Sequence, residues 1–309
     1  MYYSGLLPKF KVNRPLLKEE KENHLPTEKP LNIEPTSALS VTRVNSTYLE
    51  VTDKFYPWKG FAASLSLTIF SMMVIGGGAF FYTAFIDKWE RTLADGAEAF
   101  FALTVIYICI FSGIGIAIWF SRLDCFRYTH YPIRLNRKNR KVYVFRQDGT
   151  VLETPWDALF ITIEPAAPGR TFVDGWDLRA HVMAGDGETV LETFAFGYIS
   201  DPDNLRHYFE YLRLYMDEGP QAIAEHTPYC LNIVDKKENP VFGFKRLLVD
   251  FSYTFFMILM FFPVVFIAIG RAFAMATCKI PRWPIEVEAA CPIEKGDPWV
   301  RDASTHPAK

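Results

Sequence analysis

The stretch NRKNRKVYVFRQDGTVLETPWD, residues 136–157, decides how the water-soluble part of this chain folds. Two runs rich in β-forming residues, 141–146 and 150–154, flank an Asp148-Gly149 pair. Asp-Gly between two such runs is a strong signal for a β-hairpin, because these residues tolerate the backbone geometry of a tight turn. We therefore predict antiparallel strands here, with a further strand before them at residues 133–136.

Alternating sequences downstream extend the predicted sheet. The run LFITIEP at 159–165 alternates, and WDLRAHVM at 176–183 is joined to TVLETFAF at 189–196 through Asp186-Gly187, a second hairpin signal. Strand side chains point alternately to opposite faces. In residues 176–183 this predicts one face toward a core (Trp176, Leu178, Ala180, Val182) and one toward water (Asp177, Arg179, His181).

An amphipathic helix is expected to close this domain. Asp201-Pro202 is a typical helix start and Gly219-Pro220 ends the pattern, so we predict a helix over 201–218. Its apolar stripe consists of Leu205, Tyr208, Phe209, Leu212, Tyr215 and Met216. Residues 122–240 thus form a β-rich domain, an antiparallel barrel or sandwich capped by a C-terminal helix.

Three uncharged runs lie outside this domain. Residues 61–86 and 99–120 each reach the roughly 20 residues that a helix needs to cross about 30 Å of hydrocarbon. They predict a two-helix transmembrane hairpin over 59–121. Residues 251–270, interrupted by Pro263, predict a third span within 247–270. The expected fold class is an α+β membrane protein with three transmembrane helices.

The distribution of Lys and Arg predicts the orientation, because cationic residues that flank spans are retained in the cytoplasm. The connection 87–98 is acidic, whereas many cations follow the second span between residues 122 and 141. This asymmetry places the N-terminus and the central domain in the cytoplasm, with the spans in a bacterial inner membrane. By parity the tail, 271–309, is expected in the periplasm, although a re-entrant hairpin bent at Pro263 would return it to the cytoplasm.

Two cysteines, Cys278 and Cys291, bracket part of the tail. In an oxidising periplasm they are candidates for a disulfide. The alternative is two unpaired thiols in a cytoplasmic or membrane-adjacent tail. The side of the membrane on which the tail lies therefore decides between the two.

The composition excludes several classes of protein. A net charge of −2 and a hydrophobic content of 50% are typical neither of a nucleic-acid-binding protein nor of a wholly disordered chain. Only residues 1–58 are rich in Lys, Glu, Pro and Asn without a helical or alternating pattern. We expect this segment to be a flexible cytoplasmic arm.

No motif in the sequence carries catalytic chemistry. There is no phosphate-binding loop, no G-x-G-x-x-G, no H-E-x-x-H and no G-x-S-x-G. The cysteines form no C-x-x-C pair, and the histidines are scattered. We therefore expect a protein that is not an enzyme and that has no cofactor and no metal site.

The turn in the opening stretch carries four clustered cations, Arg137, Lys138, Arg140 and Lys141. A cation near an anionic leaflet contributes about 1 kcal/mol to membrane attraction. The cluster is therefore our candidate site for binding membrane lipids or a protein partner. The alternative is that these charges only fix the topology.

The order of the predicted elements resembles that of bacterial pleckstrin-homology-like domains, which are often fused to transmembrane segments. The resemblance covers roughly residues 132–217: the first hairpin, ETPWDALFITIEP, the paired strands and the helix DPDNLRHYFEYLRLYM. We count about six strands where that fold usually has seven. The resemblance implies that a first or last strand remains to be assigned.

A second resemblance covers more of the chain. The two spans, YPIRLNRKNRKVYVFR, the third apolar run and the tail TCKIPRWPIEVEAACPIEKGDPW are similar to a family of uncharacterised proteobacterial membrane proteins. Genes of that family tend to lie near type VI secretion and toxin loci. The similarity implies immunity to a toxic effector, or handling of one, by binding an effector, an adaptor or a second copy of the chain. The alternative is a membrane sensor or assembly factor whose β-domain reads the inner leaflet or a secretion component.

Overall fold

A computed structural model describes residues 9–166, 175–199, 201–249 and 254–307. The chain divides into two compact units. We call the first the sheet domain, which comprises Met1–Pro57, His130–Lys237 and Ile280–Lys309. The second, the helix unit, comprises Trp58–Thr129 and Glu238–Lys279. Each unit is thus assembled from segments that are far apart in the sequence.

One half of the sheet domain is a five-stranded antiparallel sheet with the order β2-β3-β4-β5-β6. The predicted hairpin is confirmed: Val144 pairs with Leu152, and the Asp148 carboxylate accepts the Thr150 N–H at 2.9 Å. The strands are β2 (Val41–Val44), β3 (Tyr48–Thr52), β4 (Pro132–Asn136), β5 (Lys141–Phe145) and β6 (Val151–Pro155). A strand from before the two apolar runs, β3, therefore pairs with one from after them, β4.

The other half is a four-stranded sheet with the order β1-β9-β8-β7. Its second hairpin is also confirmed, because the Asp186 carboxylate accepts the N–H groups of Glu188 and Thr189, both at 2.9 Å. The strands are β1 (Arg14–Pro15), β7 (Leu159–Pro165), β8 (Trp176–Met183) and β9 (Thr189–Ile199). The α+β character that we predicted is confirmed by these two sheets and the helices around them.

The helix α5 (Pro202–Asp217) fills the core between the sheets. Asp201 caps it by accepting the Asp203 N–H at 3.0 Å. The predicted apolar stripe is buried against side chains of both sheets, among them Val142 of β5 and Phe196 of β9. Full burial of a large apolar side chain contributes about 1.5–3 kcal/mol, so this stripe is a main source of stability. Short helices complete the domain: α1 (Lys18–Glu22), η2 (Trp156–Ala158), α6 (Pro220–Ile223) and α9 (Ile285–Ala290).

The expectation of a flexible arm over residues 1–58 is corrected by the part of this segment that the structure describes. Residues 41–52 contribute β2 and β3, and residues 9–31, which we call the N-terminal strap, run along the other sheet. In the strap, Arg14 pairs with Val190, and the Leu25 N–H donates to the Ile161 carbonyl at 2.8 Å. The composition was misleading because strands from distant parts of the sequence satisfy the backbone of this segment.

The tail also belongs to the sheet domain. The backbones of Val44 and Arg301 exchange two hydrogen bonds of 2.9 and 2.8 Å, and Trp283 Nε1 donates to Glu50 Oε2 at 2.8 Å. A bilayer cannot pass through a hydrogen-bonded domain, so the tail and the central strands share one compartment. These bonds favour the alternative in which the chain returns the tail to the side of the central domain, and which side of a membrane that is stays a prediction.

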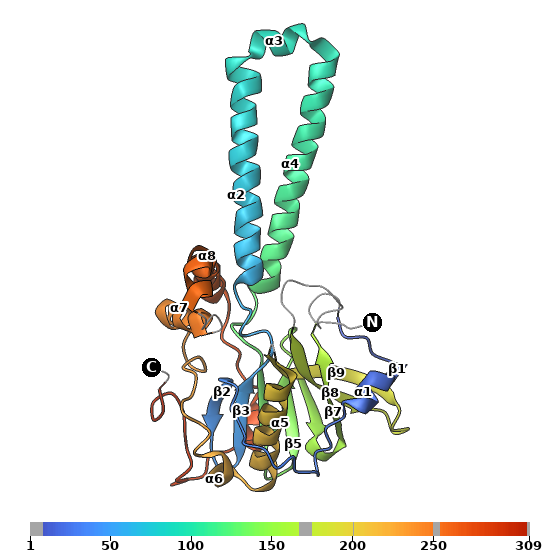
Figure 1. The fold of residues 1–309 in the computed structure, drawn as a ribbon, viewed down its shortest axis with the longest axis vertical. Helices are drawn as coiled ribbons and strands as arrows, with labels where there is room; N and C mark the ends of the chain where they lie inside the picture. The colour runs from blue at the N-terminus through green and yellow to red at the C-terminus, as the bar shows by residue number, and fades with distance from the viewer. Residues whose placement is uncertain (1–8, 167–174, 200, 250–253, 308–309) are drawn as a thin grey trace. The chain divides into compact units, whose positions relative to one another are not determined.

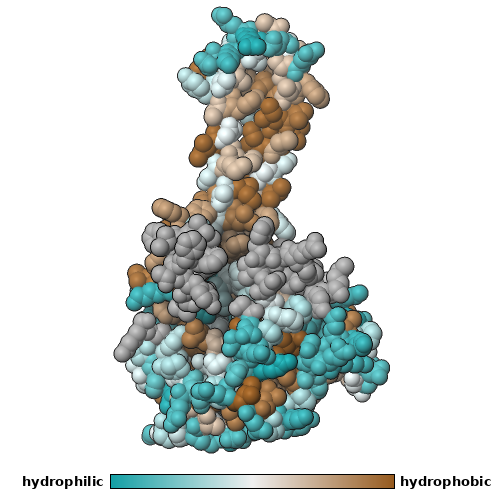
Figure 2. Space-filling model, viewed as in Figure 1, coloured by the Kyte–Doolittle hydropathy of each residue, from teal (hydrophilic) through white to brown (hydrophobic). Residues whose placement is uncertain are grey.

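Two long apolar helices dominate the helix unit. They are α2 (Phe61–Tyr82), continued by the π-helical η1 (Thr83–Asp87), and α4 (Gly96–Asp124), and α3 (Trp89–Ala94) connects them. Figure 1 shows α2 and α4 side by side as a hairpin, and Figure 2 shows hydrophobic residues along them and hydrophilic ones near α3. In the described part of the chain, Phe61–Asp87 and Gly96–Asp124 are long and apolar enough to cross a membrane.

The third predicted span is not confirmed. The region contains α7 (Pro240–Val249) and α8 (Thr254–Thr277), and Pro263 lies inside α8. Within the described residues, the apolar helix found here is Phe262–Thr277, which is shorter than a span.

Candidate functional site

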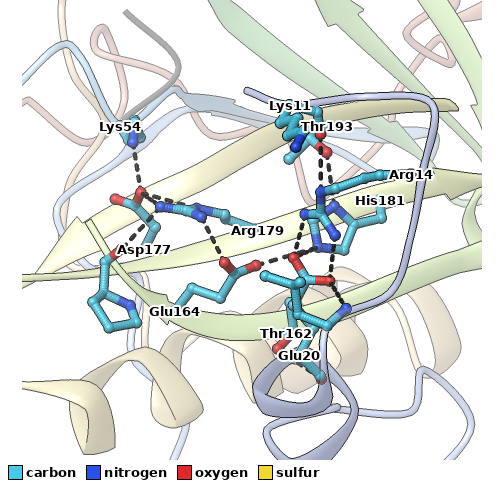
Figure 3. A network of polar contacts seen from close by, with 12 residues as sticks. Lys11, Arg14, Glu20, Lys54, Thr162, Glu164, Asp177, Arg179, His181 and Thr193 are labelled. Carbon is cyan, nitrogen blue, oxygen red and sulfur yellow. Dashed lines mark hydrogen bonds and ion pairs between the residues drawn. The ribbon is translucent and has the colours of Figure 1, made fainter. Parts of the chain in front are cut away.

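Charged side chains gather on the face of the four-stranded sheet that is opposite the core. Strand β8 supplies members at alternate positions, and β7, β1, α1 and the segment after β3 supply the others (Figure 3). We call this set the charge network: Arg14, Glu20, Lys54, Glu164, Asp177, Arg179 and His181.

The strands hold one half of the charge network. Lys54 Nζ lies 2.5 Å from Asp177 Oδ2, which also accepts from Arg179 Nη2 at 3.0 Å. Arg179 Nη1 donates to Glu164 Oε2 at 2.6 Å, and Glu164 Oε1 lies 3.2 Å from His181 Nε2. Burial lowers the pKa of Lys54, and the Asp177 carboxylate opposes that change. Acidic and basic side chains of β7 and β8 thus alternate along this half of the network.

The N-terminal strap supplies the other half through Glu20. Its carboxylate binds the Arg14 guanidinium, accepts the Leu17 N–H at 2.7 Å and lies 3.5 Å from His181 Nε2. The Glu20 carbonyl also accepts from Thr162 Oγ1 at 3.1 Å. Burial opposes the ionisation of Glu20, but the bonds from Arg14 and Leu17 and the nearby charges outweigh it and lower the pKa of this carboxyl.

The side chains of Asp177, Arg179 and His181 were expected to face water, and this expectation is corrected: each is at most 2% exposed. The N-terminal strap covers them. The ring of Phe10 lies 5.0 Å from Arg179 Cζ, and His24 stacks on Phe160 of β7 with ring centroids 4.0 Å apart. The alternating pattern predicted the faces of β8 correctly, but it carried no information about a cover from another segment.

A metal site is one chemical reading of this cluster. Glu20, Glu164 and His181 offer ligand atoms that all lie within 4.8 Å of one another. However, Arg14 already binds Glu20 and Arg179 already binds Glu164, so a cation would sit beside fixed positive charges. The Lys and Arg charges of the network also balance its Asp and Glu charges. We conclude that the arrangement is suited to fastening the strap to the sheet.

The predicted basic turn forms ion pairs with acids of its own domain. Arg140 Nε donates to Asp157 Oδ2 at 2.7 Å, and Lys141 Nζ donates to Glu153 at 2.5 Å. Lys138 pairs with Glu294 of the tail. Arg137 Nε is buried and has no hydrogen-bond partner among the described residues. The structure thus brings the four cations together, but beside a similar number of carboxylates.

A buried ion pair between β3 and β4 of the five-stranded sheet is contacted by Trp283 of the tail, and no sequence pattern predicted it. Arg134 donates to Glu50 Oε2 through Nε at 2.9 Å and Nη2 at 2.7 Å. The Trp283 ring lies 4.9 Å from Arg134 Cζ, and its Nε1 donates to the same carboxylate. Burial opposes the ionisation of Glu50, but Arg134 and Trp283 lower its pKa. The sequence feature that could have indicated this contact is Trp283, which lies between two prolines of the tail in the segment PRWP.

The predicted disulfide between Cys278 and Cys291 is not formed, because both are free thiols. Cys278 Sγ donates to the Asp124 carbonyl at 2.9 Å within the helix unit. Cys291 Sγ accepts from Asn136 Nδ2 at 3.3 Å within the sheet domain. The second alternative, two unpaired thiols, is the one that the structure shows.

Comparison with protein families finds a match for the central part of the chain. Residues 108–295, more than half of the chain, match the model of a family of unknown function, DUF6708. The chain belongs to this family. The matched range includes Glu164, Asp177, Arg179 and His181, whereas the residues that the N-terminal strap contributes lie outside it. No curated protein and no solved structure matches the chain in the corresponding comparisons.

Proposed function

We propose that this protein is anchored in a bacterial inner membrane by the α2–α4 hairpin, with the sheet domain in the cytoplasm, and that it acts by binding another protein. The proposed role is immunity to a toxic effector associated with type VI secretion, or handling of that effector. The two apolar helices and the cations that follow the second one support the membrane part.

The paired charges of the basic turn are the observation that carries the binding proposal. Anionic lipids attract unpaired cations, but Asp157, Glu153 and Glu294 offset that attraction at this turn. A surface on which charges of both signs alternate is better suited to a protein whose own charges are complementary. We therefore assign Arg137, Lys138, Arg140 and Lys141 to protein contact in preference to lipid contact.

Catalysis has less support than binding. A general base or nucleophile must reach its substrate. In the charge network, Glu164 and His181 are covered by the N-terminal strap, and Glu20 is a buried residue of the strap itself. All three are engaged with one another or with guanidinium groups. Glu50 is similarly covered and held by Arg134. These groups support a stable binding domain.

The strand order supports a pleckstrin-homology-like classification of the sheet domain. Strands β3–β9 followed by α5 supply the seven strands and closing helix of that fold, whereas the sequence count reached about six strands. The additional strand, β3, precedes the α2–α4 hairpin. In this proposal the hairpin is an insertion between the first two strands of the domain.

The proposal is tested by expressing the chain in a susceptible strain that is challenged with the effector encoded beside its gene. Two variants accompany the intact protein. The first replaces the four turn cations, Arg137, Lys138, Arg140 and Lys141, with alanine. The second is a matched control that removes the same charge from four exposed strap residues, Lys9, Lys18, Lys21 and Lys29.

Protection by the intact chain and by the strap variant, together with loss of protection in the turn variant, is the expected result. If the intact chain does not protect, immunity is discarded, and the sensor or assembly-factor role becomes the leading candidate. If the turn variant still protects, immunity stands but the turn is not the contact surface. Binding of the purified chain to the effector separates lost contact from lost expression.

A further inference from the structure

The segment Glu238–Lys279 leaves the sheet domain and returns to it. Before the segment, the Leu231 N–H donates to the Val41 carbonyl at 2.8 Å, and the Cys230 N–H donates to the His306 carbonyl at 2.7 Å. His306 follows the segment in sequence, so both ends join one hydrogen-bonded domain. If α2 and α4 cross a bilayer, the segment that holds α7 and α8 must cross it an even number of times.

Two crossings by this segment are excluded by its helices. α7 has 10 residues, and at 1.5 Å per residue it covers about 15 Å of a hydrocarbon core that is about 30 Å thick. It also carries Lys245 and Arg246, which are costly to place in hydrocarbon. A single crossing by α8 would leave the tail on the opposite side of the bilayer from the rest of the sheet domain. The segment therefore makes no crossing.

The outward surface of these helices is nevertheless apolar. The exposed fractions are 63% for Val241 of α7 and 80%, 53% and 55% for Phe262, Ile269 and Phe273 of α8. Large apolar side chains gathered on helices that pack together indicate a partner that removes them from water. The same helix unit contains two helices that are apolar enough to span a bilayer, which makes hydrocarbon the nearest partner.

Charged residues flank this apolar surface, and one pair of them is buried at the beginning of α2. At the beginning of α2, Arg271 of α8 is held by Glu238, with Arg271 Nε 2.6 Å from Glu238 Oε1, and its Nη1 donates to the Lys59 carbonyl at 3.0 Å. In the sequence, α8 begins at Thr254, eight residues after Arg246 of α7. Charged residues thus precede α8 in the sequence and lie within its last two turns, so we expect both ends of α8 at one polar boundary, and a helix with both ends at one boundary lies along it.

We propose that α7 and α8 lie within a single leaflet, the one on the side of the sheet domain, as an interfacial anchor that binds the acyl chains of membrane lipids. The apolar side chains of α8 enter the hydrocarbon, and Lys245 and Arg246 of α7 reach the headgroups. This inference rests on the proposed insertion of the α2–α4 hairpin. It replaces a third span with a surface that binds lipid from one side.

The test measures depth in liposomes that contain the full-length protein, labelled at single cysteines with the environment-sensitive fluorophore NBD. Phe262→Cys and Phe273→Cys report on α8, and Ile108→Cys, which is 60% exposed in α4, reports on the hairpin. Ser304→Cys reports on the exposed tail. All variants carry Cys109→Ala, because the other cysteines are buried. Quenching is compared between lipids brominated near the headgroup and near the end of the acyl chain.

We expect both α8 labels to be quenched more strongly by the shallow bromines, Ile108→Cys by the deep bromines, and Ser304→Cys by neither. Strong deep quenching at Phe262→Cys, or no quenching of either α8 label, overturns the interfacial anchor. If Ile108→Cys is not quenched, the membrane insertion of the hairpin itself fails, and the anchor fails with it. The hairpin label therefore distinguishes failure of the proposed function from failure of this inference alone.

Discussion

The Glu20 carboxylate holds the Arg14 guanidinium through both of its oxygens, with Arg14 Nη1 2.8 Å from Glu20 Oε2. The pair joins the first strand of the N-terminal strap to its helix. The same carboxylate faces His181 of β8, so one acidic side chain connects the strap to the sheet below it. The attachment of the strap therefore depends on the Glu20 carboxylate. Its charge can be removed with little change of shape by replacing Glu20 with Gln.

Glu20→Gln is expected to loosen the N-terminal strap. The change keeps the shape of the side chain but leaves Arg14 without the charge that it binds, and it removes one of the two carboxylates beside His181. Hydrogen bonds to charged groups contribute about 1.5–3 kcal/mol, and we expect a loss of roughly 2 kcal/mol in the free energy of unfolding. Amide hydrogen exchange should rise over residues 9–31. The control, Glu22→Gln, changes a side chain that is 60% exposed and should leave exchange unaltered.

The attachment of the strap should also depend on pH. The pKa of Glu20 in the folded protein lies below its ordinary value of 4.5. Its ionised form therefore stabilises the attached strap fully above about pH 4.5, and this contribution is lost as the pH falls through the folded pKa. Exchange over residues 9–31 should be slow at neutral pH and accelerate in acid. The increase in exchange at low pH should be smaller in Glu20→Gln than in the intact protein. An equal increase in both proteins would show that other groups cause it.

Local patterns in the sequence predicted much of the sheet domain but not the N-terminal strap. Asp148 and Asp186 determine their turns through bonds to the next few residues, so the hairpins could be predicted from neighbours alone. The burial of Asp177 depends on Lys54 and on the strap, which are far away in sequence. A strand that alternates charged and apolar residues looks the same whether water or another segment covers its polar face.

Trp283→Phe should weaken the docking of the tail. The phenyl ring keeps an aromatic surface beside Arg134 but cannot donate to the buried Glu50 carboxylate. We expect a loss of about 1–2 kcal/mol in the free energy of unfolding, and faster proteolysis of the tail. The matched control is Glu288→Gln, because Glu288 also contacts Arg134, at 3.3 Å, but is 52% exposed. A loss in the control as large as in Trp283→Phe would contradict the role of the indole N–H.

The two cysteines of the sheet domain, Cys230 and Cys291, are expected to remain reduced and slow to react. Burial raises the pKa of the Cys230 thiol to about 12 and also raises that of Cys291, so little thiolate is present at neutral pH. Intact mass should be the same with and without a reductant. Alkylation of both residues should become fast only in denaturant. A mass that rises by two hydrogens upon reduction would show that a disulfide forms after all.

Gly270→Ala should separate α8 from α2. A Cβ at residue 270 would lie 2.8 Å from the Gly60 carbonyl oxygen and 2.8 Å from the Ser64 backbone nitrogen, and neither backbone atom can move without shifting α2. Overpacking of this kind costs about 1–3 kcal/mol. Exchange over residues 262–277 should rise, while the α2–α4 hairpin stays protected. Gly78→Ala in α2 is the matched control, because a Cβ there meets nothing within 4 Å, and it should leave both regions unchanged. Unaltered exchange in Gly270→Ala would show that α8 does not pack closely on α2.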